Sequence, residues 1–108
     1  MIIATKVYGL TKSFPKNEQF ALTSQLNRAV VSIASNIAEG ASRDSEKDFA
    51  HFLEISLGSA FEVETQILIA KNLGYVVDED ISEVIGRLEK LEKQINQFIC
   101  KIRPIANS

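Results

Sequence analysis

The chain of 108 residues is poor in the residue types that build disulfide frameworks, zinc sites and linkers. Its single cysteine, Cys100, excludes an intrachain disulfide, and its single histidine, His51, argues against a zinc site built from this chain alone. Two prolines, five glycines and no low-complexity tract or internal repeat leave little room for linkers. We therefore expect residues 1–108 to form a single domain, in a reducing compartment.

The sequence also lacks a long apolar run and a marked excess of charge of either sign. No stretch approaches the ~20 apolar residues of a membrane span, and the first ten residues show no secretory signal. The formal net charge is −2, from 12 basic and 14 acidic residues, so no global positive field draws nucleic acid to the protein. We expect a cytoplasmic protein with no membrane contact and no small-molecule substrate.

What the chain does hold is apolar residues spaced by three and four positions, with hydrophobic residues making up 45% of the sequence. This spacing is typical of helices that bury one face. A first helix is predicted over residues 2–13. A second begins between residues 17 and 24, where Thr23 or Ser24 would cap it, and ends at Gly40.

Two longer helices follow. The capping-box sequence at residues 45–48 opens a third helix, and Gly74 suits its C-terminal end. Asp78 or Asp80 would cap a fourth helix, which Pro104 would end. Since no β-hairpin signal appears, the sequence predicts an all-α fold, an antiparallel up-down-up-down four-helix bundle with a short first helix.

The predicted helices differ in length. A third helix of about 28 residues is ~42 Å long and exceeds the first by more than three turns. Part of its groove would therefore lack a cover within one subunit, so that either another chain covers it or the chain extends upstream. Apolar and small residues around the second and third helices also indicate burial on more than one side. We expect a homo-oligomer.

Four segments carry a specific pattern: LTKSFP at residues 10–15, LTSQLNRAVVSIASNIAEGASR at 22–43, FAHFLEISLGSAFEVETQ at 49–66 and LGY at 73–75. In these segments the chain resembles the four-helix-bundle proteins encoded by intervening sequences in bacterial large-subunit ribosomal RNA genes. The resemblance implies a pentameric assembly. That family is related to the accessory variability protein of diversity-generating retroelements, a strongly basic pentamer that binds the reverse transcriptase and its RNA. Typical members carry further residues before the position of Met1.

Several polar residues lie within these motifs among apolar neighbours. They would form either a polar site in the bundle core or a network that fixes the register between helices or subunits, for example by pairing Arg28 or Arg43 with a glutamate. We favour the structural or interface network. Its candidate members are Arg28, Asn36, Glu39, Arg43, Glu62 and Gln66.

No motif predicts a catalytic residue, a bound metal or a cofactor. A di-iron bundle needs two Glu-x-x-His motifs, and Asp48 with His51 supplies at most half of one. We interpret His51 as a surface or interface residue and Cys100 as a small core filler. The segment from Gly40 to Arg43 precedes a helix N-terminus and would serve as a turn or, less in keeping with its sequence, as an anion site.

The sequence Gly58-Ser59-Ala60 in the middle of the third helix predicts a close helix crossing, because glycine there costs roughly 1 kcal/mol in helix propensity. Small residues of the second helix would complement it within the chain or across a subunit seam. The candidates for that role are Ala29, Ala34 and Ala38.

Basic residues gather towards the end of the fourth helix, interleaved with Glu83, Glu89 and Glu92. They form either a solvated face of paired charges or an edge that contacts RNA or another partner. The candidates for nucleic-acid or partner contact are Arg87, Lys90, Lys93, Lys101 and Arg103.

Three functions are compatible with this sequence. The first is a non-enzymatic homo-oligomer, pentameric by resemblance, that acts as a scaffold or binding module for another macromolecule. The second is an RNA-binding protein associated with ribosomal RNA or a reverse transcriptase, whose ring multiplies a weak basic site. The third, a small enzyme or metal protein, needs carboxylates and His51 to converge across subunits. We expect the first.

Overall fold

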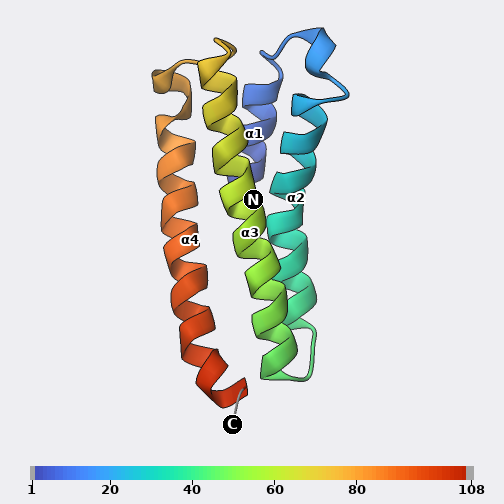
Figure 1. Ribbon diagram of the computed structural model, residues 1–108, viewed down its shortest axis with the longest axis vertical. Helices are drawn as coiled ribbons and strands as arrows, with labels where there is room; N and C mark the ends of the chain where they lie inside the picture. Colours follow the sequence, from blue (N-terminus) through green and yellow to red (C-terminus); the bar gives the residue numbers. More distant parts are fainter. Residues whose placement is uncertain (1, 107–108) are drawn as a thin grey trace.

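The computed structural model describes residues 2–106, with side chains described for residues 2–103. The elements in chain order are α1 (Ile2–Thr11), the 3-10 helix η1 (Lys16–Glu18), α2 (Leu22–Ala41), α3 (Glu46–Asn72) and α4 (Asp78–Ala106). Successive α-helices run in alternating directions along an elongated molecule of 49 × 24 × 19 Å (Figure 1). The prediction of an all-α four-helix bundle is therefore confirmed.

None of the described helices combines the length and apolarity needed to cross a membrane.

The four α-helices pack in a closed ring in chain order, with α1 against α4. Helix α3 contacts α2 and α4, and α1 contacts the same two helices from the other side. With 10 residues against the 27 of α3, however, α1 covers only one half of the long axis (Figure 1). The predicted mismatch in helix length is present in the structure.

The buried side chains form two clusters. The larger lies in the half that contains α1 and includes Val7, Leu26 and Leu88, all with no exposed surface. The smaller lies in the other half, where Leu53 of α3 packs with residues of α4 such as Ile99. Half-buried residues of α2 and α4 pack against both clusters, so the bundle has one continuous interior with an uneven cover.

Some helix ends follow the local signals in the sequence. The side chain of Ser45 caps α3 by accepting a hydrogen bond from the backbone N–H of Asp48, at 3.0 Å. After α3, Gly74 adopts a φ of +81°, the left-handed conformation that glycine tolerates best. At the start of α4, Asp80 Oδ2 accepts from the backbone N–H of Val77 at 3.2 Å. The predictions for the two ends of α3 were correct, whereas Asp78 and Asp80 lie inside the first turn of α4.

Other ends differ from the prediction. Helix α2 begins at Leu22, so Thr23 and Ser24 lie inside its first turn, and no side chain of the preceding residue caps it. Instead the carboxylate of Glu18 accepts from the backbone N–H of Leu22 at 3.5 Å. The prediction that Pro104 ends the fourth helix is wrong, since α4 continues to Ala106. A proline near a helix end removes one backbone hydrogen bond without forcing the chain out of the helix.

Gly40 has a role other than the predicted helix stop. It lies inside α2, which continues to Ala41, and it is buried against α3. A Cβ at this position would lie 2.9 Å from Cδ1 of Phe49 and 2.9 Å from Cβ of Phe52. The glycine is therefore required by the close approach of two helices.

Candidate functional site

Small polar side chains join α2 to α3. The hydroxyls of Ser32 and Ser59 lie 2.9 Å apart, and the amide of Asn36 donates to the carbonyl and the hydroxyl of Ser32 at 2.8 and 2.9 Å. Deeper in the bundle, the buried hydroxyl of Ser56 donates to the carbonyl of Ile33 at 2.8 Å. Asn36 thus belongs to a hydrogen-bonded seam between helices.

The other predicted network residues do not converge on one site. Arg43 pairs with Glu39 one turn away. Its guanidinium also lies 5.0 Å from the ring centre of Phe52, which favours the turn interpretation of this segment over an anion site. On α3 the buried amide of Gln66 donates to Glu62 at 3.1 Å. Five of the six residues therefore form separate local contacts.

Arg28 is the exception among the arginines. Arg43, Arg87 and Arg103 each pair with a glutamate, whereas Arg28 is exposed and has no ion pair among the described side chains. It borders a hollow of about 360 Å³ between α1 and α2, beside Tyr8 and Val31, which are 45% and 46% exposed. Its other flank borders a hollow shared with Glu62 between α2 and α3. Only the predicted pairing of Arg43 is realised.

The predicted close crossing uses two of the three small residues. Ser59 and Ala60 are buried, and Ser59 meets Ser32 across the seam. A Cβ placed on Gly58, in contrast, would meet nothing within 4 Å, because this residue faces outwards. Nothing within the described part of the chain explains the glycine at position 58.

The basic residues of α4 divide into paired and unpaired groups. Arg87 lies 3.3 Å from Glu83, and Arg103 pairs with Glu54 of α3. No ion pair joins the remaining basic candidates to any described side chain, and all of them are exposed. These are Lys90, Lys93 and Lys101.

An acidic hollow between α3 and α4 was missed at the level of sequence. It has a volume of about 410 Å³, and its charged lining residues are Glu64, Glu89, Glu92 and Lys93, with Phe61 at its side. Glu92, which the pattern placed on a solvated face, is only 8% exposed. The available signal was its position four residues after Leu88, on the side of α4 that faces the core.

The carboxylates of the acidic hollow are incompletely paired. Glu64 Oε1 and Glu92 Oε2 are buried and have no hydrogen-bond partner among the described residues. Burial first, then a side-chain hydrogen bond with Glu64 and the negative charges of Glu64 and Glu89, together raise the pKa of Glu92 from 4.5 to about 7. Up to about pH 7 a proton on Glu92 therefore serves this pair of carboxyl groups, and no cation of the described chain pairs with the two buried oxygens.

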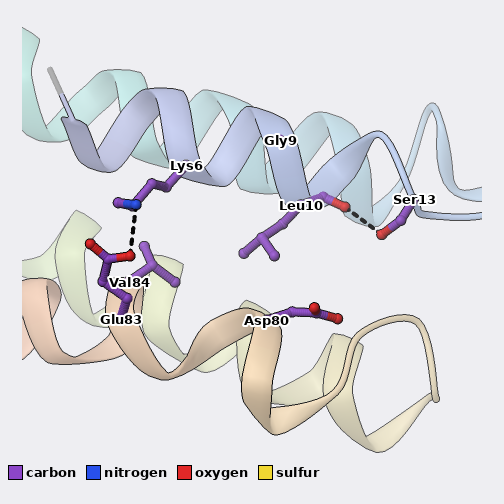
Figure 2. A pocket seen from close by; sticks show the side chains of 7 residues that line it. All are labelled: Lys6, Gly9, Leu10, Ser13, Asp80, Glu83 and Val84. Carbon is purple, nitrogen blue, oxygen red and sulfur yellow. Dashed lines mark hydrogen bonds and ion pairs between the residues drawn. The ribbon is translucent and has the colours of Figure 1, made fainter.

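A second hollow, of about 310 Å³, separates α1 from the start of α4 (Figure 2). Lys6 crosses it to Glu83 at 2.9 Å, and Ser13 donates to the carbonyl of Leu10 at 2.7 Å. The carboxylate of Asp80 already accepts from the backbone at the start of α4. Because its polar groups have partners within the chain, we interpret this hollow as part of the contact between α1 and α4, which the ion pair of Lys6 and Glu83 bridges.

His51 and Cys100 do not belong to any polar cluster. His51 is exposed, with its ring edge-on to Phe52 at 5.7 Å between centres. Cys100 is exposed, which corrects the prediction of a core filler, because Ile99 and Ile102 take the inward positions on this part of α4. Among the residues described, no group of three or more His, Cys, Asp or Glu side chains is placed to hold a metal ion.

Comparisons agree with this architecture. A crystal structure of a protein of unknown function from the S23 ribosomal protein family of Bacteroides thetaiotaomicron has a TM-score of 0.82 to this chain, at 24% identity. The match covers 90% of this chain and 91% of that chain, and at this identity it supports the fold alone. No curated protein matches the chain in sequence. A family model described as 23S rRNA-intervening sequence protein matches residues 1–97, and the chain accordingly belongs to that family.

Proposed function

We propose that this protein is a non-enzymatic homo-oligomer, a pentamer as the family resemblance implies, that acts as a scaffold or binding module for another macromolecule. The observation that carries the proposal is the apolar outer face of α3. Four large apolar side chains of this helix are 39% to 51% exposed in the single chain: Ile55, Phe61, Leu68 and Ile69.

Their arrangement favours a helix-to-helix contact between subunits. Steps of three and four residues from Ile55 through Gly58 to Ile69 keep them on the side of α3 that its neighbours α2 and α4 leave uncovered. Large exposed apolar patches on soluble proteins mark interaction sites. The outward-facing Gly58 would let a second backbone approach this face closely.

A second apolar surface supports a further partner. The two connections at the end of the bundle that holds η1 expose Phe20 by 91%, Leu73 by 53% and Val77 by 58% (Figure 1). This end continues from the outer face of α3, because Ile69 lies one helical turn before Leu73. It suits contact with another macromolecule while the bundle sides serve assembly.

The test is size-exclusion chromatography with light scattering on the wild-type chain and on a double variant, Ile55→Ser with Ile69→Ser. The proposal expects an oligomer for the wild type and a shift of the variant towards the mass of one chain. The control is Ile2→Ser, which removes an equally apolar side chain, 57% exposed, from α1. A wild-type chain that stays monomeric at every concentration would overturn the proposal.

RNA binding is the second candidate, favoured by the family description and by the unpaired lysines of α4. Lys90 and Lys101 are eleven positions apart, so they lie on one side of the helix about 16 Å from each other. With two tyrosines and no tryptophan, bound nucleic acid would dominate the absorbance of the purified protein. If the protein binds RNA, the ratio of absorbance at 260 nm to that at 280 nm should fall when salt releases the RNA. The ratio should also be lower in a variant with both lysines changed to glutamate.

A further inference from the structure

The acidic hollow carries an inference about how one copy meets the next. It combines three carboxylates, those of Glu64, Glu89 and Glu92, with a single cation, Lys93, and no residue of α1 or α2 lines it. Two buried carboxylate oxygens, Glu64 Oε1 and Glu92 Oε2, lack donors within the described chain. In the free chain a proton on Glu92 serves this pair of carboxyl groups up to about pH 7, and a cation from outside would take the place of that proton.

The opposite side of the bundle presents such a cation. Arg28 is the arginine without an ion pair among the described side chains, and the exposed Tyr8 and Val31 lie around it. A guanidinium offers paired N–H donors in a fixed fork, which can serve two carboxylate oxygens together. It also stacks favourably on aromatic rings, and Phe61 at the side of the hollow supplies one, 51% exposed.

The two sites are placed for a head-to-tail contact. Because α1 and α3 each pack between α2 and α4, the side formed by α1 and α2 is opposite the side formed by α3 and α4. Arg28 lies six residues from the start of α2, or about 9 Å along the axis from the end that holds η1. Glu64 lies eight residues from the end of α3, about 12 Å from the same end of the bundle.

We propose that Arg28 of one copy enters the acidic hollow of the next copy and pairs there with Glu64 and Glu92. This inference rests on the homo-oligomer proposed above and names its contact. Opposite faces at similar heights form a heterologous interface, which gives a closed ring when the rotation between copies closes.

The pairing makes assembly dependent on pH. In the unfilled hollow Glu92 holds its proton up to about pH 7, whereas an arginine beside it favours the charged carboxylate. Association then releases a proton, and the charged groups that bear on it are Glu64 from α3 with Glu89 and Lys93 from α4. For a group that titrates near pH 7, linkage strengthens each contact about tenfold between pH 6 and pH 8.

The experiment measures the dissociation constant by sedimentation at pH 6 and pH 8. We expect Arg28→Glu to weaken association at least tenfold, and the swap of Arg28→Glu with Glu64→Arg to restore it. Lys90→Glu, with the same change of charge on an exposed part of α4, is the control. Glu92→Gln should remove the dependence on pH, and circular dichroism checks that each variant is helical.

The outcomes separate the two proposals. A wild-type oligomer that Arg28→Glu leaves intact at both pH values overturns the arginine contact while the homo-oligomer stands. An oligomer that is weakened equally by Arg28→Glu and Lys90→Glu also overturns it, because general charge then decides assembly. A wild-type chain that never associates overturns the homo-oligomer itself.

Discussion

The hydroxyl of Tyr75 donates a hydrogen bond of 2.6 Å to Glu18, 57 positions away in the chain. The same carboxylate accepts from the backbone N–H of Leu22 at the start of α2, and the ring of Tyr75 lies 5.5 Å from that of Phe14. The connection between α1 and α2 is thereby fastened to the connection between α3 and α4. Two of the recognised motifs, LTKSFP and LGY, meet at this point.

The first prediction concerns the ionisation of Tyr75. The hydrogen bond to Glu18 raises the pKa of the phenol above its ordinary value, with burial and the negative charge of Glu18 adding to the rise. In a Tyr8→Phe background, which leaves one tyrosine to observe, Glu18→Gln should lower the pKa of Tyr75. Absorbance of the tyrosinate during an alkaline titration measures it, and an unchanged midpoint would show that the bond is not formed in solution.

The second prediction concerns Gly40. Its replacement by alanine should lower the free energy of unfolding by about 1–3 kcal/mol, because the added methyl overlaps Phe49 and Phe52. Gly86→Ala is the matched control, since a Cβ there meets nothing within 4 Å and alanine favours the helix by up to ~1 kcal/mol. Urea unfolding compares the two. If both variants are stabilised, α2 and α3 do not approach as closely as described.

The third prediction concerns Gly58. Alanine there should weaken self-association although it meets nothing within the chain, because a second copy would occupy the space outside α3. Gly86→Ala again provides the control, now for assembly. The measurement is the oligomer mass on dilution. Equal masses for wild type and both variants would mean that no backbone packs closely against Gly58.

The fourth prediction concerns Glu92 when no arginine of a second copy enters the acidic hollow. We choose the Arg28→Ala background to obtain this state. The folded pKa of about 7 exceeds the unfolded value of 4.5, so the folded state binds more protons between these values. The free energy of unfolding should therefore fall by about 2–3 kcal/mol as the pH rises from 4.5 past 7.

Adding Glu92→Gln to that background should flatten this pH dependence and make the protein more stable than its parent at pH 8. Glu79→Gln, a change of the same type at an exposed position of α4 outside the hollow, should leave the slope in place. Urea unfolding at pH 5 and pH 8 provides the data. If the free energy of unfolding changes equally with pH in the parent and in the Glu92 variant, Glu92 is exposed to solvent in the folded state.

Local sequence signals explain the parts of the fold that were predicted correctly. Ser45 and Gly74 act through backbone geometry within a few residues, so their roles follow from the sequence around them. Gly40 and Cys100 were misread because their surroundings depend on which helix packs beside them. A glycine that permits a close crossing has the same local appearance as one that ends a helix.

The candidate site shows the same division. The pairing of Arg43 with Glu39 is a contact within one helix turn and follows from spacing alone. The acidic hollow joins Glu64 to Glu92 across two helices, and no spacing relates residues 28 positions apart. That Arg28 has no ion pair likewise cannot be predicted from spacing, because it depends on the positions of carboxylates on other helices.

Because α1 is short, the two halves of the bundle differ in local stability. Around Val7 and Leu26 the interior is enclosed by four helices, while Leu53 and Ile99 are enclosed by three. Backbone amides in the second region should therefore exchange with deuterium through smaller local openings than those of the first. The half that contains α1 is therefore the more stable part of the bundle. Association along the sides of the bundle would stabilise the other half, where α1 is absent.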